Sequence, residues 1–389
     1  MLLQKAKKNQ IMVIGILKEP AHENRVSVLP EVAGQLVKMN CTVKVEDQAG
    51  ALAFAKNSDY EMAGAGVLSR NEILSQSDLI IGINCISNEE IGKLKTNAVL
   101  IAVLQPLFNK STVLACVEHN VSTFSLDMVP RTTRAQSMDI LSSQATAGGY
   151  KAVLTAAIHL PKFFPMFMTA AGSITPAKVL ILGAGVAGLQ AIATAKRLGA
   201  VIEAFDTRAA VKEEVQSLGA KFIEVEGAAD SKSAGGYAVE QSKEFQEKQK
   251  QKIHESAIKS DVIITTAQIP GRKAPVLITK ETVAAMKNGA VIVDMAASTG
   301  GNCEMTKNNE VIDVNGVTII GNSNLPSSIP SDASKMFGKN VLNLLKLMIT
   351  KEGNLNLNFE DDIVRGSCIT HNKEVINERV KQTLTEQTA

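Results

Sequence analysis

Three glycines in the middle of the chain have the spacing of a turn that binds phosphate. The apolar run Val179–Leu182 is followed by Gly183, Gly185 and Gly188. Gly183 permits a tight turn, Gly185 lets the backbone approach a pyrophosphate, and Gly188 lets the next helix pack closely on the strand. That helix directs N–H groups and the positive end of its dipole at the phosphates. The turn, with Val186 in it, predicts a dinucleotide site; close packing of small residues is the alternative.

An acid at the end of the next expected strand indicates which dinucleotide binds. Asp206 lies 18 residues beyond Gly188, where a carboxylate accepts hydrogen bonds from an adenosine ribose and repels a 2′-phosphate. Thr207 and Arg208 follow it and are included in the predicted site. Arg208 is discordant, because an arginine here can pair with a 2′-phosphate. We expect Asp206 to outweigh it, so that the protein binds NAD(H) and not NADP(H).

A second polar cluster lies between residues 127 and 144, directly after the expected strand Ser122–Leu126. It contains two arginines, two amides, acids and hydroxyls. Polar side chains at the carboxyl end of a strand are where α/β proteins place their chemistry. The alternative is the beginning of a helix with Ser137 or Asp139 as its N-cap, and both interpretations can hold together.

The composition excludes several other functions. Forty-one basic and 39 acidic residues leave a net charge of +2, aromatic residues make up 4% and tryptophan is absent, so the footprint of a nucleic-acid-binding protein is missing. The five cysteines are scattered without a C-x-x-C pair, which indicates thiols of a reducing compartment and predicts neither disulfides nor a metal site. We expect no secretory signal and no membrane-spanning segment, since prolines, a histidine and a lysine interrupt the apolar stretch Ala152–Ile174.

The elements that must position these residues follow from the hydrophobic pattern. At 389 residues, 45% of them hydrophobic, the chain is long enough for two domains. Short runs rich in Val, Ile and Leu alternate with stretches of helical spacing, which predicts parallel sheets covered by helices. The expected strands are Met12–Leu17, Thr42–Glu46, Leu79–Ile83, Ala98–Leu104, Ser122–Leu126, Val179–Leu182, Val201–Phe205, Phe222–Val225, Val262–Thr266, Val291–Met295 and Val317–Ile320. The main expected helices are Glu31–Met39, Ser142–Leu160, Leu189–Leu198, Val239–Glu255 and Ile329–Met348.

We therefore predict an α/β protein of two Rossmann-like, doubly wound domains with mainly parallel sheets, joined by long crossover helices. The first domain comprises residues 1–145 and 330–389 and has no glycine fingerprint. The second comprises residues 146–329 and binds NAD(H), and we expect the dinucleotide to lie in the cleft between the domains.

The motifs together resemble the NAD(H)-binding component of proton-translocating NAD(P) transhydrogenase, in the split bacterial form with a separate alpha subunit. The stretches that carry the resemblance are Gly15–Pro20, Glu23–Pro30, Arg131–Gln144, Gly183–Gly188, Gly236–Tyr237, Thr265–Gly271 and Ala296–Cys303. The resemblance implies hydride transfer from NADH to NADP⁺ on a partner subunit, coupled to proton translocation. It also implies a homodimer, membrane-spanning and NADP(H)-binding partner subunits, and a cytoplasmic position at the inner membrane through those partners.

The resemblance also implies roles for individual residues. Arg131, Gln136, Asp139 and Ser142 would hold the dihydronicotinamide and its carboxamide. Tyr237 would lie on a glycine-rich loop that closes over the cofactor. The other residues implied in cofactor binding are Thr132, Thr133, Arg134, Gly236, Thr265, Ala267 and Gln268. The cofactor carries the redox chemistry, so none of these residues needs to act as an acid or base.

Alanine dehydrogenase belongs to the same superfamily, shares this fold and is the alternative. That family binds pyruvate with an arginine, a lysine and a histidine. Arg25 is present, but the lysine and histidine positions fall on Asn84 and Gln105. Neither amide titrates near neutrality, so neither can supply the proton that an oxo-acid reductase requires. A third alternative, a protein that binds NAD(H) without turnover, would have no use for the cluster at Arg131–Ser142.

Overall fold

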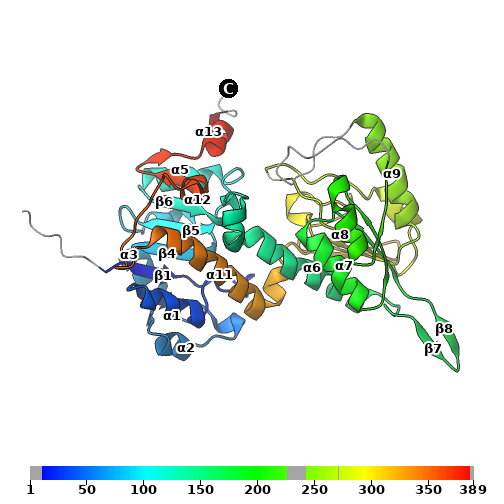
Figure 1. Ribbon diagram of the computed structural model, residues 1–389, viewed down its shortest axis with the longest axis horizontal. Coiled ribbons are helices and arrows are strands. Elements are labelled where there is room, and N and C mark those ends of the chain that lie inside the picture. The colour runs from blue at the N-terminus through cyan, green and yellow to red at the C-terminus, as the bar shows by residue number, and fades with distance from the viewer. Residues whose placement is uncertain (1–10, 226–241, 270, 386–389) are drawn as a thin grey trace, which may run out of the picture. The chain divides into compact units, whose positions relative to one another are not determined.

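A computed structural model of the chain describes residues 11–225, 242–269 and 271–385 (Figure 1). The described chain divides into two compact units. Unit 1 comprises residues 1–144 and 329–389, and unit 2 comprises residues 145–328. Each unit contains one large sheet, and α6 (Ile140–His159) carries the chain from the first unit into the second.

The sheet of unit 1 has eight strands in the order β17-β16-β6-β5-β4-β1-β2-β3. The strands from β6 to β3 are parallel, whereas β16 and β17 are added antiparallel at the β6 edge. Their bounds are β1 Val13–Ile16, β2 Thr42–Glu46, β3 Gly66–Leu68, β4 Leu79–Asn84, β5 Val99–Val103, β6 Ser122–Ser125, β16 Cys368–His371 and β17 Glu374–Val375.

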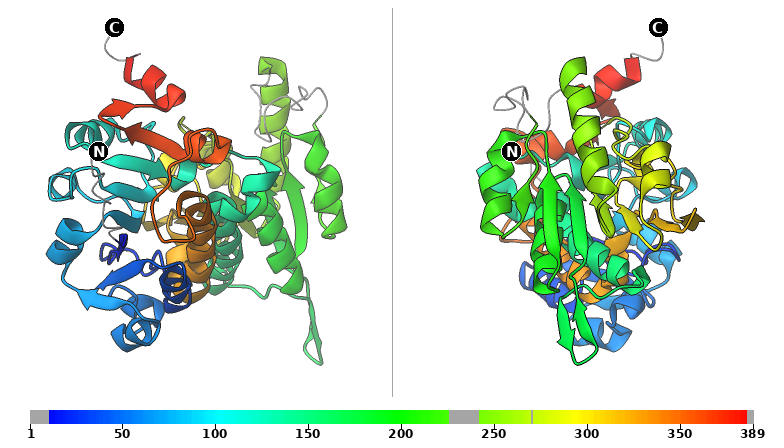
Figure 2. Two further views of the ribbon diagram at one scale, coloured as in Figure 1. Left: turned by 60° about the vertical axis from the view of Figure 1, so that its left-hand side comes forward. Right: turned by 90° about the vertical axis from the view of Figure 1, so that its right-hand side faces the viewer.

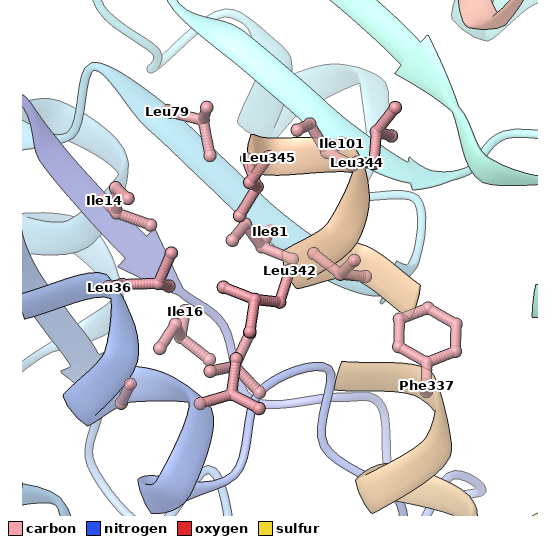
Figure 3. Close-up of a cluster of buried hydrophobic side chains, with 14 of the residues drawn as sticks. Ile14, Ile16, Leu36, Leu79, Ile81, Ile101, Phe337, Leu342, Leu344 and Leu345 are labelled. Carbon is pink, nitrogen blue, oxygen red and sulfur yellow. The ribbon is translucent and has the colours of Figure 1, made fainter. Parts of the chain in front are cut away.

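Helices cover both faces of this sheet. The longest of them within unit 1, α11, begins at Pro330, whose fixed φ suits the first helical turn. It buries Phe337 and Leu345 in the same core as Ile14 and Ile81 of the central strands (Figure 3). The helices of unit 1 are α1 Pro30–Lys38, α2 Asn57–Met62, α3 Arg70–Gln76, α4 Asn88–Ile91, α5 Lys110–Glu118, α11 Pro330–Met348, α12 Asp362–Ser367 and α13 Glu378–Thr385.

The sheet of unit 2 has seven strands in the order β11-β10-β9-β12-β13-β15-β14, all parallel except β14. The chain runs from central β9 outward to β11 and returns to the other side of β9 at β12, which makes a topological switch point beside β9. The bounds are β9 Lys178–Leu182, β10 Val201–Phe205, β11 Lys221–Phe222, β12 Val262–Thr265, β13 Val291–Asp294, β14 Val311–Val314 and β15 Val317–Ile320. The helices are α7 Val186–Arg197, α8 Lys212–Ser217, α9 Lys243–Ala257 and α10 Lys280–Ala285.

The predicted α/β class with mainly parallel Rossmann-like sheets is confirmed, but several elements differ from the prediction. Strands β3, β14, β16 and β17 were not predicted, because strands of two to four residues with polar positions do not form a long apolar run. β11 ends at Phe222 and not at Val225. α6 and α7 begin at Ile140 and Val186, two and three residues earlier than expected.

A further hairpin lies within the segment 161–176, which the sequence analysis treated as a plain connection. Its strands β7 (Phe167–Thr169) and β8 (Gly172–Ile174) pair antiparallel, and all their residues are exposed (Figure 2). Phe163 packs edge-on against Phe167 at its base, with 4.6 Å between ring centroids.

All five cysteines carry free thiols. Burial raises the pKa of Cys116 and of Cys368 to about 12, so both remain protonated at neutral pH. Four of the five are buried and Cys85 is half-buried, as the composition predicts for packing residues. Within the described ranges, no helix combines the length and the apolar character needed to cross a membrane.

Candidate functional site

The glycine turn after β9 has the geometry that its spacing predicts. Gly183 has φ +100°, and a Cβ at this position would lie 2.5 Å from the hydroxyl oxygen of Thr266. A Cβ at Gly188 would overlap the carbonyl oxygen of Gly183. Gly185 is the N-cap of α7 and has no side chain, so the N–H groups of the first turn are left to solvent or to a ligand.

Strand register places three loops at the same edge of the sheet. Leu182 of β9 pairs with Phe205 of β10 on one side and with Thr265 of β12 on the other. The residues that follow these strands therefore lie side by side at the switch point. The hydroxyl of Thr266 donates to the carbonyl oxygen of Gly183 at 3.0 Å, which ties the loop after β12 to the glycine turn.

Asp206 holds the glycine turn and also Arg208. Its carboxylate accepts the backbone N–H of Ala184 at 2.7 Å, and it accepts the backbone N–H, Nε and Nη2 of Arg208 at 2.8, 2.9 and 2.8 Å. The hydrogen bond to Asp206 raises the pKa of the Arg208 guanidinium. The side chains of Arg208 and Asp206 are only 20% and 7% exposed. The arginine that is discordant in the sequence is thus the partner of the acid, and Thr207 lies half-buried between them.

The end of β12 and the loop after it contain three more of the predicted cofactor residues, Thr265, Ala267 and Gln268. Ala267 is half-buried, and Gln268 is exposed and donates from Nε2 to the carbonyl oxygen of Met295 at 3.1 Å. Thr265 is fully buried, and its hydroxyl donates to Oδ1 of Asp294 at 2.9 Å. Thr265 therefore supports this loop from inside and does not line its surface.

Two polar residues that the sequence analysis did not single out hold this loop in place. Asn302 accepts the N–H of Ala267 at 3.0 Å and donates to its carbonyl oxygen at 2.9 Å. Asp294, at the end of β13, is fully buried. Its carboxylate accepts hydrogen bonds from the hydroxyls of Thr265 and Thr306 and from the N–H groups of Ala296, Asn302 and Cys303. In the sequence, an acidic residue at the end of an apolar strand is the signal for this role of Asp294. Its hydrogen-bond partners follow only from the fold.

In unit 1, the predicted nicotinamide residues lie on one segment around the beginning of α6. Asp139 accepts the backbone N–H of Ser142 at 3.0 Å and its hydroxyl at 2.6 Å. Asp139 is thus the N-cap of α6, and this part of the helix-cap interpretation is confirmed. Arg131 and Gln136 are exposed, whereas Asp139 and Ser142 are half-buried. Thr132 and Thr133, at the 3₁₀ helix Thr133–Met138, are also exposed.

Arg134 is engaged by the C-terminal segment of the same unit. Its guanidinium donates to both carboxylate oxygens of Asp361 at 2.6 and 2.8 Å, and it also pairs with Asp362. The hydrogen bond from Arg134 lowers the pKa of Asp361 to about 2. Arg134 therefore holds the N-terminus of α12 to the cluster, a contact that the sequence did not reveal. Gly236 and Tyr237 lie outside the described residues.

The switch point of unit 1 lies between the carboxyl ends of β1 and β4, where Glu19 and Asn84 line a pocket. Glu19 is buried, accepts the N–H groups of Ile83 and Asn84 and the side-chain amide of Asn84, and its pKa is raised by burial. Arg25 is also buried and forms a two-pronged ion pair with Glu23 at 2.8 and 2.6 Å.

The two positions that distinguish an oxo-acid reductase have other tasks. The side-chain amide of Asn84 donates to the carboxylate of Glu19. The guanidinium of Arg25, the third residue of that comparison, donates to the side-chain oxygen of Gln144 at 2.7 Å. Gln105 is exposed with φ +48°, and its N–H lies 3.4 Å from the Asp127 carboxylate, whose pKa burial raises. The charge of Arg25 is thus balanced within the protein. Among the described residues, no group of three or more His, Cys, Asp or Glu side chains is placed to hold a metal ion.

Fold and site together define a two-domain, Rossmann-like protein in which one unit carries a glycine-rich dinucleotide turn and the other does not. Models of the alanine dehydrogenase/PNT family match both regions of the chain, the N-terminal domain over residues 15–147 and the C-terminal domain over residues 152–378. The chain belongs to this alanine dehydrogenase/PNT family.

Individual relatives favour the transhydrogenase branch of the family. The chain is 43% identical to the first of the polypeptides that make up NAD(P) transhydrogenase subunit alpha in Rhodospirillum rubrum, over 94% of this chain and 98% of that one. Its fold matches the crystal structure of transhydrogenase from Sinorhizobium meliloti with a TM-score of 0.86 and 41% identity, over 94% and 100% of the two chains. Alanine dehydrogenase of Staphylococcus haemolyticus is only 27% identical, over 87% of this chain and 88% of that one.

Proposed function

We propose that the chain is the NAD(H)-binding alpha subunit of a proton-translocating NAD(P) transhydrogenase. In this role it would take part in hydride transfer between NADH and NADP⁺ held on a partner subunit. The observation that carries the proposal is a complete glycine turn with Asp206 beside it, in a chain 43% identical to a transhydrogenase alpha subunit along 94% of its length.

The residues of unit 2 fit a dinucleotide. The nearest described atom to a Cβ built at Gly185 is Nη2 of Arg208, 3.9 Å away, so the side of the turn at Gly185 is open to a pyrophosphate. The first turn of α7 would bind the phosphates through its N–H groups. Asp206 at the end of β10 would meet the adenosine ribose, which favours NAD(H). On the other side of β9, Ala267 and Gln268 would border the nicotinamide half.

The cluster in unit 1 would orient the reacting ring. NADH supplies the hydride when bound, so the protein must position the ring and keep it there. Asp139 fixes the hydroxyl and N–H of Ser142, which makes the start of α6 a stiff platform. Arg131 and Gln136 are exposed on the segment before it and can reach a ligand. Arg134 would contribute by holding this segment to α12.

The partner subunits belong to the same proposal. Relatives from Rhodospirillum rubrum and Rickettsia prowazekii are named as the first portion of a divided subunit alpha, so each of those enzymes has further subunits. Those names support further subunits for the present chain. We propose that its partners hold NADP(H) and span the membrane, and that the chain is peripheral to the membrane on the cytoplasmic side.

A homodimer is also proposed, and its support is the β7–β8 hairpin. Several large apolar side chains are exposed on and beside this hairpin, including Phe167 and Met168, and clustered exposed apolar surface marks sites of protein association. Analytical ultracentrifugation at micromolar concentration should therefore show a dimer, and monomeric behaviour there would contradict it.

The test of the function separates hydride transfer from binding. Gln136→Ala and Asp139→Asn should each slow transfer to NADP⁺ on a partner subunit by about a hundredfold, since a misplacement of about 1 Å has that effect. NADH affinity should change by about tenfold or less, because a lost neutral hydrogen bond contributes roughly 0.5–1.5 kcal/mol. Asparagine is as good an N-cap as aspartate, so α6 should persist. Wild-type transfer rates in both variants would show that the cluster only caps a helix.

The alternative enzyme class is tested with the isolated wild-type chain. Because Arg25 is paired with Glu23 and neither Asn84 nor Gln105 titrates near neutrality, NADH, pyruvate and ammonia should give no turnover. Sustained formation of alanine would contradict the proposed function and favour an alanine dehydrogenase.

A further inference from the structure

Arg208 lies where the specificity of the dinucleotide site is decided. Its Nη2 is 3.9 Å from the Cβ position of Gly185, so the guanidinium borders the turn that would hold the pyrophosphate. Its Nε and Nη2 form a planar fork, and both donate to Asp206. This fork matches a phosphate as well as it matches a carboxylate.

The structure assigns to Asp206 a second role in cofactor choice: it occupies Arg208, a latent receptor for the 2′-phosphate of NADP(H). This inference rests on the proposed binding of NAD(H) at the glycine turn. The carboxylate repels a 2′-phosphate directly and also uses the donors of the guanidinium that would otherwise attract it. Removal of the negative charge at residue 206 therefore changes two interactions at once, and both changes favour NADP(H).

The neighbouring charges set the size of the expected effect. Besides Asp206, Glu214 of α8 interacts electrostatically with Arg208, and because it remains when residue 206 is changed, it limits the gain in affinity for a phosphate. The pair Arg208–Asp206 is nearly neutral as a unit, so a phosphate gains little by approaching it. With a neutral residue 206, the same guanidinium presents its positive charge at the end of β10, where the adenosine ribose is expected.

Asp206→Asn is the informative variant. One carboxylate oxygen of Asp206 accepts the N–H of Ala184, and the amide oxygen of asparagine can preserve that bond. Asp206→Ser is a second variant that removes the charge and keeps an oxygen. Glu203→Gln is the matched control, because Glu203 lies on the same strand β10 and pairs with Lys221, away from Arg208.

The experiment titrates the purified full-length chain with NADH, NADPH and adenosine 2′-monophosphate. Wild type and Glu203→Gln should bind NADH and discriminate against NADPH. Asp206→Asn should bind NADPH and adenosine 2′-monophosphate about ten- to a hundredfold more tightly than wild type, the range expected for hydrogen bonds between charged groups. The double variant Asp206→Asn/Arg208→Gln should lose that gain.

Three results would overturn the inference. If wild type binds NADH but neither Asp206→Asn nor Asp206→Ser gains affinity for NADPH, Arg208 is not a latent receptor. If the gain persists in the double variant, another cation is responsible. If wild type fails to bind NADH at the outset, the proposed function itself is wrong, and this inference falls with it.

Discussion

The two units have similar sheets but differ in the connection that follows the central strand. In unit 2 only residues 183–185 separate β9 from α7, and two of them are glycines. In unit 1 residues 17–29 separate β1 from α1, and none of them is a glycine. The short turn leaves backbone N–H groups at the switch point, whereas the long one brings in Glu19, Glu23 and Arg25.

This difference shows that the first connection decides what a ligand meets at the switch point, either backbone N–H groups or charged side chains. Unit 1 lines its switch point with a buried glutamate that accepts backbone N–H groups, and a buried ion pair follows on the same connection. In unit 2 the turn itself contributes no large side chain, since a Cβ at Gly183 or Gly188 would collide with neighbouring atoms. The shared architecture therefore assigns no function, and the local connection does.

The largest effect on stability is expected from Gly188→Ala, which changes the packing of α7 on the short turn after β9. The added Cβ would overlap the carbonyl oxygen of Gly183, so β9 and α7 must separate and the free energy of unfolding should fall by about 4 kcal/mol or more. Gly185→Ala is the matched control, because its Cβ meets no described atom closer than 3.9 Å.

Chemical denaturation and NADH titration of Gly188→Ala and Gly185→Ala check this prediction. Gly185→Ala should lower the free energy of unfolding by only about 1 kcal/mol or less, since alanine suits a φ of −79° but is a poorer N-cap than glycine. It should nevertheless weaken NADH binding by at least about tenfold, because the methyl group occupies the approach of the pyrophosphate. Equal stability of the two variants would mean that the close packing at Gly188 is relaxed in solution.

A smaller effect on stability is expected from Glu23→Gln, which changes the long connection of unit 1. It leaves the charge of Arg25 buried without its carboxylate, and breaking such a pair costs about 3 kcal/mol. The control Glu203→Gln removes an exposed pair and should change stability by less than about 1 kcal/mol. Denaturation of both variants gives the comparison. NADH affinity of folded Glu23→Gln should equal that of wild type, and its loss would contradict the division of roles between the units.

The smallest effect concerns the pair of Arg134 with Asp361, whose contribution to stability should be lost in acid. The pKa of Asp361 is lowered from 3.8 to about 2 by Arg134, so the pair contributes stability above pH 3.8 that is lost as pH falls through 2. The difference in unfolding free energy between wild type and Asp361→Asn should therefore be constant above about pH 4 and shrink toward pH 2. A difference that stays constant down to pH 2 would show that Asp361 acts only as the uncharged cap of α12.

Sequence information was sufficient where a contact is local. The conformation of Gly183, the packing of Gly188 and the capping by Asp139 each involve residues close in sequence, and the structure has all three. The pairing of Arg208 with Asp206 is also local, but both residues lie beyond the end of β10, where strand alternation no longer sets the direction of a side chain.

The remaining contacts could not be predicted from the sequence, because they join segments that are distant along the chain. Arg134 meets Asp361 from 227 positions away, and Asn302 meets Ala267 across 35. Thr265 was expected to face a cofactor, yet the pleat of β12 turns its side chain toward Asp294. The roles proposed for Arg131, Gln136, Tyr237 and the other cofactor residues stay predictions until binding and transfer are measured.

The hydrogen bonds of Asp294 should couple the local opening of two segments of unit 2. One buried carboxylate accepts five hydrogen bonds, and it joins the end of β12 to the loop after β13. Neither segment can detach without exposing the same unpaired charge, so the two should open as one cooperative unit. In hydrogen–deuterium exchange, the amide protons of Ala296, Asn302 and Cys303 should therefore share one slow rate, and Asp294→Asn should accelerate all three together.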